Sequence, residues 1–347
     1  MIHIVIVGPT GLVGRELSNL CRTMKYNDKV KYYFVASENS IGNTFYFQNN
    51  PYIIQSLENL FQIISIESHS KKYIFVNCAN NSVAEDISTF IKYMNSNNLI
   101  LIDNSSQFRL DENVPLIIPE INFEYKPEYQ IYSTPNCCTV ILAFLLNIFI
   151  QQKKQIYNIN VSTYQSASGA GINGLNELIQ QSIDYNNNTN LTKEFWHKQY
   201  IYNCFVHNST IKNKETRFNE EEEKLIFEIP KIFNKLIKIN PTCIRVPTLR
   251  SHCMSVSITF NQELDYETII KYLNSNECII VKDDIDNLDF PDTIGSSGTT
   301  KIFIGHIRQC IYNKLIWTFF ISADQLIRGA AFNCYNILIN YLNHHKV

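Results

Sequence analysis

Two adjacent cysteines, Cys137 and Cys138, stand directly before an apolar stretch that predicts a helix. A thiolate is a strong nucleophile, and the unpaired N–H groups and dipole of a helix N-terminus lower the pKa of a thiol placed there. Neighbouring helical residues point about 100° apart, so both sulfurs cannot face the same pocket. The stretch STPNCCTV (133–140) therefore predicts one reactive cysteine, with two buried structural cysteines as the alternative.

Charged residues further along the chain could serve such a thiol. In IRVPTLRSH, Arg245 offers a planar fork for a carboxylate or phosphate, and His252 could move a proton. The simpler interpretations are a surface ion pair for the arginine and a satisfied core histidine. The run from Glu220 to Lys224 is most simply a solvated helix N-terminus.

Two glycine-containing loops could receive a cofactor. GPTGLVG (8–14) follows an apolar strand candidate and precedes a helical pattern, so its amides could approach a pyrophosphate. A tight turn without a ligand is the alternative. The loop SASGAG (166–171) also suits close approach by a cofactor or an oxyanion.

The elements that must position these residues fall into two groups. Strand candidates at 3–8, 31–37, 72–79 and 98–105 alternate with amphipathic stretches, which predicts a Rossmann-type doubly wound parallel sheet in an α/β protein. After about residue 156, helical segments mix with strand-like runs, which predicts a second, α+β domain. We expect a dinucleotide-binding domain at 1–130, completed by a returning C-terminal helix within 323–347, and a catalytic domain at 131–322.

Composition narrows the class of partner. The 347 residues are 45% hydrophobic and carry a net charge of −2, which disfavours nucleic acid and anionic membranes and favours a small molecule. The longest apolar run, 140–150, is too short to span a bilayer, and the N-terminus lacks a secretory pattern. Ten scattered cysteines without a CxxC motif indicate reduced thiols. We expect a cytoplasmic protein without a resident metal.

Seven ordered motifs resemble the aspartate-β-semialdehyde dehydrogenase family over nearly the whole chain. They are the glycine turn, IDNSSQFRLDENVPLIIPEIN, TPNCCT, VSTYQSASGAG, EEEK, IRVPTLRSH and SADQLIRGAAFN. The resemblance implies NADPH-dependent reductive dephosphorylation of L-4-aspartyl phosphate to the semialdehyde through a cysteine thioester. It places this step in lysine (diaminopimelate), threonine and methionine biosynthesis, and it implies a homodimer formed through the second domain.

The resemblance also assigns roles to residues. It makes Cys137 the nucleophile, His252 the general acid/base, and Gln165 the neighbour of the reacting carbonyl. The implied substrate-binding residues are Arg109, Asn136, Glu221, Lys224 and Arg245. The implied cofactor-binding residues are Gly8, Thr10, Gly11, Leu12, Val13, Ser37, Asn39, Ser168, Gly169 and Gln325, the last facing the nicotinamide.

Departures from the family pattern concern the cofactor more than the chemistry. Asn39 stands where the family commonly has an arginine for the NADP 2′-phosphate, so NAD is the alternative coenzyme. Asn43 replaces the lysine of the same loop, Asn80 and Asn81 replace two glycines, and 202–210 lacks the family's proline. Two other functions compete: an N-acetyl-γ-glutamyl-phosphate reductase, which Glu221 disfavours, and a non-catalytic dinucleotide-binding sensor.

Overall fold

The chain folds into two compact units. The computed structural model describes residues 2–67 and 70–345. One unit comprises Met1–Pro135 with Ala330–Val347, and the other comprises Asn136–Gly329. The expected domain boundaries, at 130 and 322, lie a few residues before these divisions.

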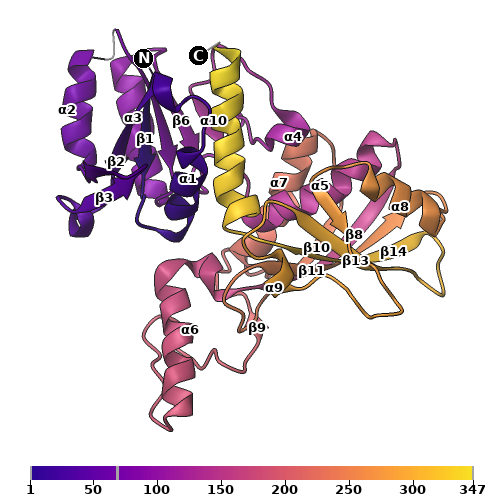
Figure 1. Cartoon of the computed structure of the whole chain (residues 1–347). Helices are drawn as coiled ribbons and strands as arrows, with labels where there is room; N and C mark the ends of the chain where they lie inside the picture. The colour runs from indigo at the N-terminus through magenta and orange to yellow at the C-terminus, as the bar shows by residue number, and fades with distance from the viewer. Residues whose placement is uncertain (1, 68–69, 346–347) are drawn as a thin grey trace. The chain divides into compact units, whose positions relative to one another are not determined.

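A five-stranded sheet forms the centre of the first unit, with all its strand pairs parallel (Figure 1). The strand order is β2-β1-β5-β6-β7. The bounds are β1 Ile2–Val7, β2 Val30–Val35, β5 Lys72–Asn77, β6 Leu99–Asp103 and β7 Ile131–Ser133; a separate hairpin pairs β3 Thr44–Phe47 with β4 Asn50–Ile53. The order reverses direction between β1 and β5, and ligands of open α/β sheets bind at such a switch point. The predicted doubly wound parallel sheet is confirmed.

Helices cover both faces of this sheet. One core gathers the inner faces of α1 and α10, and a second core gathers those of α2 and α3. The bounds are α1 Leu12–Arg22, α2 Leu57–Glu67, α3 Asn81–Met94, α4 Pro119–Asn122 and α10 Phe332–His344, with short 3₁₀ helices η1 Asn27–Lys29 and η2 Glu38–Ser40. The C-terminal helix is thus part of the first unit.

The second unit is built on a seven-stranded mixed sheet of order β12-β13-β14-β11-β8-β10-β9. The strands are β8 Ile156–Gln165, β9 Phe205–Val206, β10 Ile239–Arg245, β11 His252–Phe260, β12 Ile279–Val281, β13 Ile302–Gln309 and β14 Ile316–Ala323. The helices are α5 Cys137–Gln151, α6 Gly171–Asn186, α7 Glu220–Phe233, α8 Tyr266–Asn274 and α9 Thr293–Ser296, with η3 Ala167–Ala170 and a π-helical turn, η4 Ile327–Ala331. This mixed sheet confirms the predicted α+β character.

Strand register brings polar residues to one end of this sheet. β8 and β10 run parallel, and their last residues, Gln165 and Arg245, are paired. The antiparallel neighbour β11 begins at the same end with His252. Residues far apart in the sequence therefore meet because three strands share one end.

The helix α5 is the most enclosed helix of the second unit. Every residue from Cys138 to Phe149 is buried, which explains why its sequence is apolar all round rather than on one face. Across the described ranges 2–67 and 70–345, we find no helix with both the length and the apolarity needed to cross a membrane.

Candidate active site

Cys137 opens helix α5, and its backbone is held by the preceding asparagine. The Oδ1 atom of Asn136 accepts the N–H of Cys138 at 2.9 Å, which is an ordinary N-cap. The backbone N–H of Asn136 donates to Glu228 at 2.7 Å. Cys137 is partly exposed whereas Cys138 is fully buried, so Cys137 is the thiol that a substrate can reach.

The nucleophile candidate also packs against Gly329 of the π-helical turn. A Cβ atom added to Gly329 would lie 2.7 Å from the Cβ of Cys137, closer than carbon atoms approach in proteins. Only glycine fits there without displacing the cysteine. The sequence analysis did not single out this glycine, although it lies in the SADQLIRGAAFN motif.

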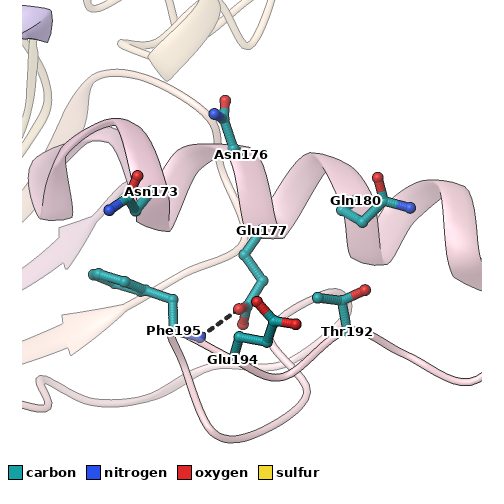
Figure 2. Close-up of a pocket in the computed structure, with 7 residues that line it drawn as sticks. All are labelled: Asn173, Asn176, Glu177, Gln180, Thr192, Glu194 and Phe195. Atoms are coloured by element: carbon teal, nitrogen blue, oxygen red, sulfur yellow. Dashed lines mark hydrogen bonds between the residues drawn. The ribbon is translucent and has the colours of Figure 1, made fainter. Parts of the chain in front are cut away.

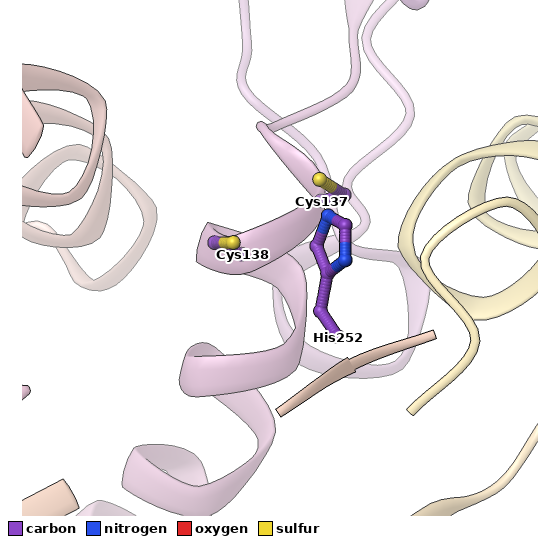
Figure 3. Close-up of side chains that lie close together, drawn as sticks. All are labelled: Cys137, Cys138 and His252. Carbon is purple, nitrogen blue, oxygen red and sulfur yellow. The ribbon is translucent and has the colours of Figure 1, made fainter. Parts of the chain in front are cut away.

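His252 lies beside the two cysteines (Figure 3). The Sγ atoms of Cys137 and Cys138 and a ring nitrogen of His252 all lie within 4.8 Å of one another. The two sulfurs therefore lie near one shared point, contrary to the expectation that they cannot face the same pocket. The Nδ1 atom accepts the backbone N–H of Ser166 at 3.1 Å, which leaves the proton of the neutral imidazole on Nε2. Within the described part of the chain, Nε2 has no hydrogen-bond partner. The ring is therefore buried with one nitrogen fixed and the other available.

Neighbouring groups favour the ionised form of Cys137. Hydrogen bonding from the Cys138 thiol is the largest effect, and the nearby His252 imidazole adds to it. Together they hold the pKa of Cys137 well below its ordinary value although burial opposes this. Burial and the interaction with Cys137 raise the pKa of Cys138 well above its ordinary value. One thiol of the pair is thus prepared to ionise and the other to remain protonated.

Glu221, in the first turn of α7, is the centre of a polar network. Its Oε1 accepts N–H groups from Asn136 at 3.0 Å and Gln165 at 3.2 Å, and its Oε2 accepts from Lys224 at 2.9 Å. Burial alone would raise the pKa of this carboxyl, but Lys224, His207 and Arg245 outweigh burial and hold it well below its usual range.

The expectation of a solvated helix terminus at 220–224 is therefore wrong for two of its members. Glu221 is 4% exposed and Glu222 is 7% exposed. Glu222 completes a capping box with Asn219 and also accepts the N–H of Cys243 at 3.1 Å. Both carboxylates are buried because backbone and side-chain donors satisfy them.

Arg245 is buried at the end of β10. Its Nη1 donates to the carbonyl oxygen of Ser166 at 3.0 Å, and its guanidinium lies 5.6 Å from the ring centroid of Trp196. It is 4% exposed, so the surface ion pair is excluded. Gly169 lies against this group, because an added Cβ would come within 3.0 Å of Arg245 and 3.1 Å of His252.

Three further residues of this site escaped the sequence analysis. Ser166 contacts both His252 and Arg245. Its loop of small residues had indicated only that a cofactor or an oxyanion could come close to the backbone. Glu228 lies one helical turn beyond the EEEK motif, and no sequence motif points to it. His207 stands near Glu221, and burial followed by the charge of Arg245 lowers its pKa to about 3. The one sequence feature that could have pointed to His207 is the departure of segment 202–210 from the family pattern.

The glycine turn of the first unit has the geometry that a dinucleotide requires. Gly8 has φ +78°, in the left-handed region that favours glycine. A Cβ on Gly14 would lie 2.0 Å from the Gly8 carbonyl oxygen, so α1 begins unusually close to the turn. The turn therefore has a left-handed glycine and a close strand-to-helix approach, which are also found in turns that bind a pyrophosphate at a helix N-terminus.

The other residues predicted for the cofactor lie in both units. Thr10, Leu12 and Val13 accompany the glycine turn, and Ser37 and Asn39 are exposed just after β2. In the second unit, Gln325 donates to the Oγ of Ser168 at 2.6 Å and accepts the N–H of Ser251 at 2.8 Å. Arg109, predicted for the substrate, belongs to the first unit, where it is buried and donates to the Asn104 carbonyl at 2.9 Å.

A separate pocket of about 450 Å³ lies along α6 and contains none of the predicted site residues (Figure 2). Its lining residues are Asn173, Asn176, Glu177, Gln180, Thr192, Glu194 and Phe195. The Glu177 carboxylate accepts the backbone N–H groups of Phe195 and Trp196. This acid therefore stabilises the loop after α6 and is not free for a ligand.

The chain matches known proteins along its whole length. Residues 3–126 match the family model described as "Semialdehyde dehydrogenase, NAD binding domain", and residues 148–328 match "Semialdehyde dehydrogenase, dimerisation domain". It is 32% identical to an aspartate-semialdehyde dehydrogenase of Prochlorococcus marinus over 96% of this chain and 94% of that protein. It is also 32% identical to one of Helicobacter pylori over 98% of both chains.

A solved structure shows the same similarity to aspartate-semialdehyde dehydrogenases. The chain is 27% identical, with a TM-score of 0.86, to the crystal structure of Vibrio cholerae aspartate semialdehyde dehydrogenase II complexed with ASA, covering 99% of this chain and 98% of that one.

Proposed function

The chain belongs to the aspartate-semialdehyde dehydrogenase family, and from this premise we propose that it reduces L-4-aspartyl phosphate to L-aspartate 4-semialdehyde, releasing phosphate. The observation that carries the proposal is the position of Cys137. The partly exposed thiol of Cys137, at a helix N-terminus, lies within 4.8 Å of the buried imidazole of His252. The buried carboxylate of Glu221 and the buried guanidinium of Arg245 lie at the same end of the sheet.

The charges of the site match those of aspartyl phosphate. This substrate carries a carboxylate, an ammonium group and an acyl phosphate. Arg245 would bind the carboxylate as a planar fork, and Glu221 would bind the ammonium group. Lys224 would bind the phosphate, and the family resemblance assigns Arg109 to the substrate as well. Asn136 and Gln165 already donate to Glu221, so they orient the carboxylate toward its ligand.

The mechanism begins at the sulfur. The Cys137 thiolate attacks the acyl carbon, the bond from that carbon to the phosphate oxygen breaks, and a thioester forms on the enzyme. A nicotinamide coenzyme, held by the glycine turn of residues 8–14 and by Gln325, would supply the hydride that the thioester carbon accepts. The Nε2–H group of His252 would donate a hydrogen bond to the oxyanion that develops on the thioester oxygen, and would keep its proton at that oxygen. The adduct on Cys137 then collapses to the aldehyde, and the carbon–sulfur bond breaks to regenerate the Cys137 thiolate.

The glycine turn supports a nicotinamide dinucleotide as the coenzyme, and we propose NADPH. The structure gives the adenosine side little to hold a 2′-phosphate, because residues 32–70 contain no lysine or arginine and Asn39 and Glu38 are exposed after β2. The proposal of NADPH therefore comes from the family resemblance, and because this loop offers no cation for a 2′-phosphate we propose that NADH is also accepted.

A homodimer is the proposed assembly. The match of residues 148–328 to the dimerisation-domain model supports it. Ile172, Ile179 and Ile183 add a physical reason, since their spacing places them on one exposed face of α6. Exposed apolar stripes of this kind mark protein interfaces.

The phosphate-dependent oxidation of aspartate semialdehyde tests the function in the reverse direction. We expect sustained formation of reduced coenzyme, beyond one per active site, only when phosphate is present, and no turnover by Cys137→Ser protein that still binds the coenzyme. N-acetylglutamate semialdehyde should not be oxidised, because its acylated nitrogen offers Glu221 no cation. Steady turnover of the acetylated aldehyde, but not of aspartate semialdehyde, would overturn the proposal.

A further inference from the structure

We propose that Cys137, Cys138 and His252 also form a binding site for a thiophilic divalent cation such as Zn²⁺ or Cd²⁺, which inhibits the enzyme by occupying its nucleophile. Within residues 2–67 and 70–345, these three side chains are the one cluster of histidine, cysteine and acidic groups with the spacing of metal ligands. The proposed cation is an inhibitor and has no part in the reaction itself.

The distances are close to those of a zinc site. All three ligand atoms lie within 4.8 Å of one another. Zinc binds sulfur at about 2.3 Å and nitrogen at about 2.0 Å, so tetrahedral ligands of these types stand roughly 3.5 to 3.8 Å apart. Side-chain rotations that move the ligand atoms by about 1 Å would close the site. Cys137 is partly exposed and gives the cation a route of entry.

The ligand atoms are soft, and two of them are already in or near the state that a metal ion requires. Two thiolates and an imidazole select Zn²⁺ and Cd²⁺ over Mg²⁺ and Ca²⁺. Cys137 favours its ionised form, and the Nε2 atom of His252 is buried without a hydrogen-bond partner in the described structure. Ser166 Oγ lies 3.2 Å from Nδ1 and can accept its proton, which frees the Nε2 lone pair for the cation.

Two features should limit the affinity and make the inhibition reversible. Cys138 is fully buried with a raised pKa, so the cation must displace its proton. The backbone N–H of Ser166 points at Nδ1 and opposes the tautomer that the metal needs. Binding should therefore strengthen as the pH rises and weaken as it falls.

Cadmium titration of the full-length, reduced protein tests the site without relying on turnover. The ultraviolet charge-transfer absorbance of cadmium–thiolate bonds should saturate at one ion per chain, and iodoacetamide should then no longer label Cys137. In the Cys138→Ser variant, which keeps a hydrogen-bond donor beside Cys137, we expect at least about tenfold weaker binding and half the absorbance per bound ion. The Cys204→Ser variant removes an exposed thiol elsewhere and should bind like the parent protein.

Three results would overturn the proposal. They are full affinity and absorbance in the Cys138→Ser variant, loss of binding in the Cys204→Ser variant, and rapid labelling of Cys137 in the cadmium-saturated protein. Circular dichroism of both variants separates ligand loss from misfolding, and His252→Asn is the second ligand variant if Cys138→Ser does not fold. Because the absorbance does not depend on turnover, failure of the proposed reaction would leave this test intact.

Discussion

The ionisation of Cys137 depends on the residues immediately around it. The Cys138 thiol and the His252 imidazole favour the thiolate, while burial and the nearby Glu221 carboxylate oppose it. The net effect is a pKa well below the ordinary 9.0 of a cysteine. A helix N-terminus contributes in the same direction. Of the two adjacent thiols, Cys137 is therefore the one that favours the thiolate, and Cys138 is the largest contributor to this preference.

The pH dependence of alkylation tests this ionisation. Because the folded-state pKa is lowered, the thiolate of Cys137 persists as the pH falls below 9.0, where an ordinary thiol becomes protonated. We expect the rate of iodoacetamide labelling of Cys137, followed by peptide mass spectrometry, to stay nearly constant from pH 9 to neutrality. Free glutathione in the same tube should lose about tenfold in rate per pH unit. Parallel decline of the two rates would show that the pKa is not lowered.

We predict that the side chain at position 39 influences the choice of coenzyme. An Asn39→Arg variant places a guanidinium where a 2′-phosphate would lie, and an arginine–phosphate pair is charge-assisted and bidentate. We expect kcat/KM for NADPH to rise about tenfold relative to NADH. The Asn43→Gln variant, in the same exposed loop, is the uncharged control and should leave the ratio unchanged. A ratio that does not move in Asn39→Arg protein would place the adenosine ribose elsewhere.

At the scale of elements, the site is formed by the ends of helices and strands. Two helix N-termini, of α5 and α7, supply Cys137 and Glu221, and three strand ends supply Gln165, Arg245 and His252. Ends of elements leave backbone groups unpaired, and the capping residues that satisfy them can also hold the reactive side chains. Asn136 does both, because it caps α5 and donates to Glu221.

Replacing Asn136 should therefore affect both stability and activity. In Asn136→Ala we expect a loss of about 1 kcal/mol in the free energy of unfolding, the ordinary cost of a missing N-cap. The lost hydrogen bond to a charged carboxylate should lower kcat/KM for aspartate semialdehyde roughly 10- to 100-fold. Urea unfolding and steady-state kinetics measure the two effects.

The matched control is Asp265→Ala. Asp265 caps α8 through the N–H of Thr268 at 2.8 Å and is exposed, with no contact to the site. It should show a similar loss of stability with unchanged kinetics. Equal kinetic effects in the two variants would mean that Asn136 acts only as a cap.

At the scale of the whole molecule, the function depends on two units with different tasks. The parallel sheet presents a glycine turn at its switch point, and the second unit carries Cys137 at the start of α5 together with Gln165, Arg245 and His252 at strand ends. The helix α6 extends from the rest of the second unit (Figure 1). The exposed residues Ile172, Ile179 and Ile183 form an apolar stripe on one of its faces. Its opposite face packs on the cluster formed with Trp196 and Tyr200.

This stripe predicts how the proposed dimer can be weakened. Light scattering should give about twice the chain mass of 40.3 kDa for the parent protein. The Ile179→Glu variant places a charge in the stripe and should dissociate at concentrations where the parent protein remains dimeric. Tyr93→Glu, at an exposed tyrosine of the first unit, is the control and should not change the mass. A monomeric parent protein would contradict the assembly.

The sequence predicted long elements better than short ones. The strands β1, β5 and β6 and the helix α5 are continuous apolar runs, so their patterns were clear. The hairpin β3–β4 and the two-residue strand β9 were not predicted, because short segments carry little periodicity and depend on tertiary contacts.

The residue types of the site could also be predicted, but not their surroundings. The family resemblance indicated Cys137 and His252, whereas the burial of Glu221 follows from hydrogen bonds to Asn136 and Gln165, which are distant in the sequence. Gly329 was missed because its constraint comes from a close approach across the fold. The roles of all these residues remain predictions until they are measured.

The most direct test of the central claim is a rapid-mixing experiment without phosphate. Aspartate semialdehyde and oxidised coenzyme should give a burst of reduced coenzyme close to one per active site, because the Cys137 thioester forms but phosphate is absent to release it. Mass spectrometry should find the acyl group on Cys137, and the Cys137→Ser variant should show no burst. A full burst in that variant, or an acyl group on another residue, would contradict the account.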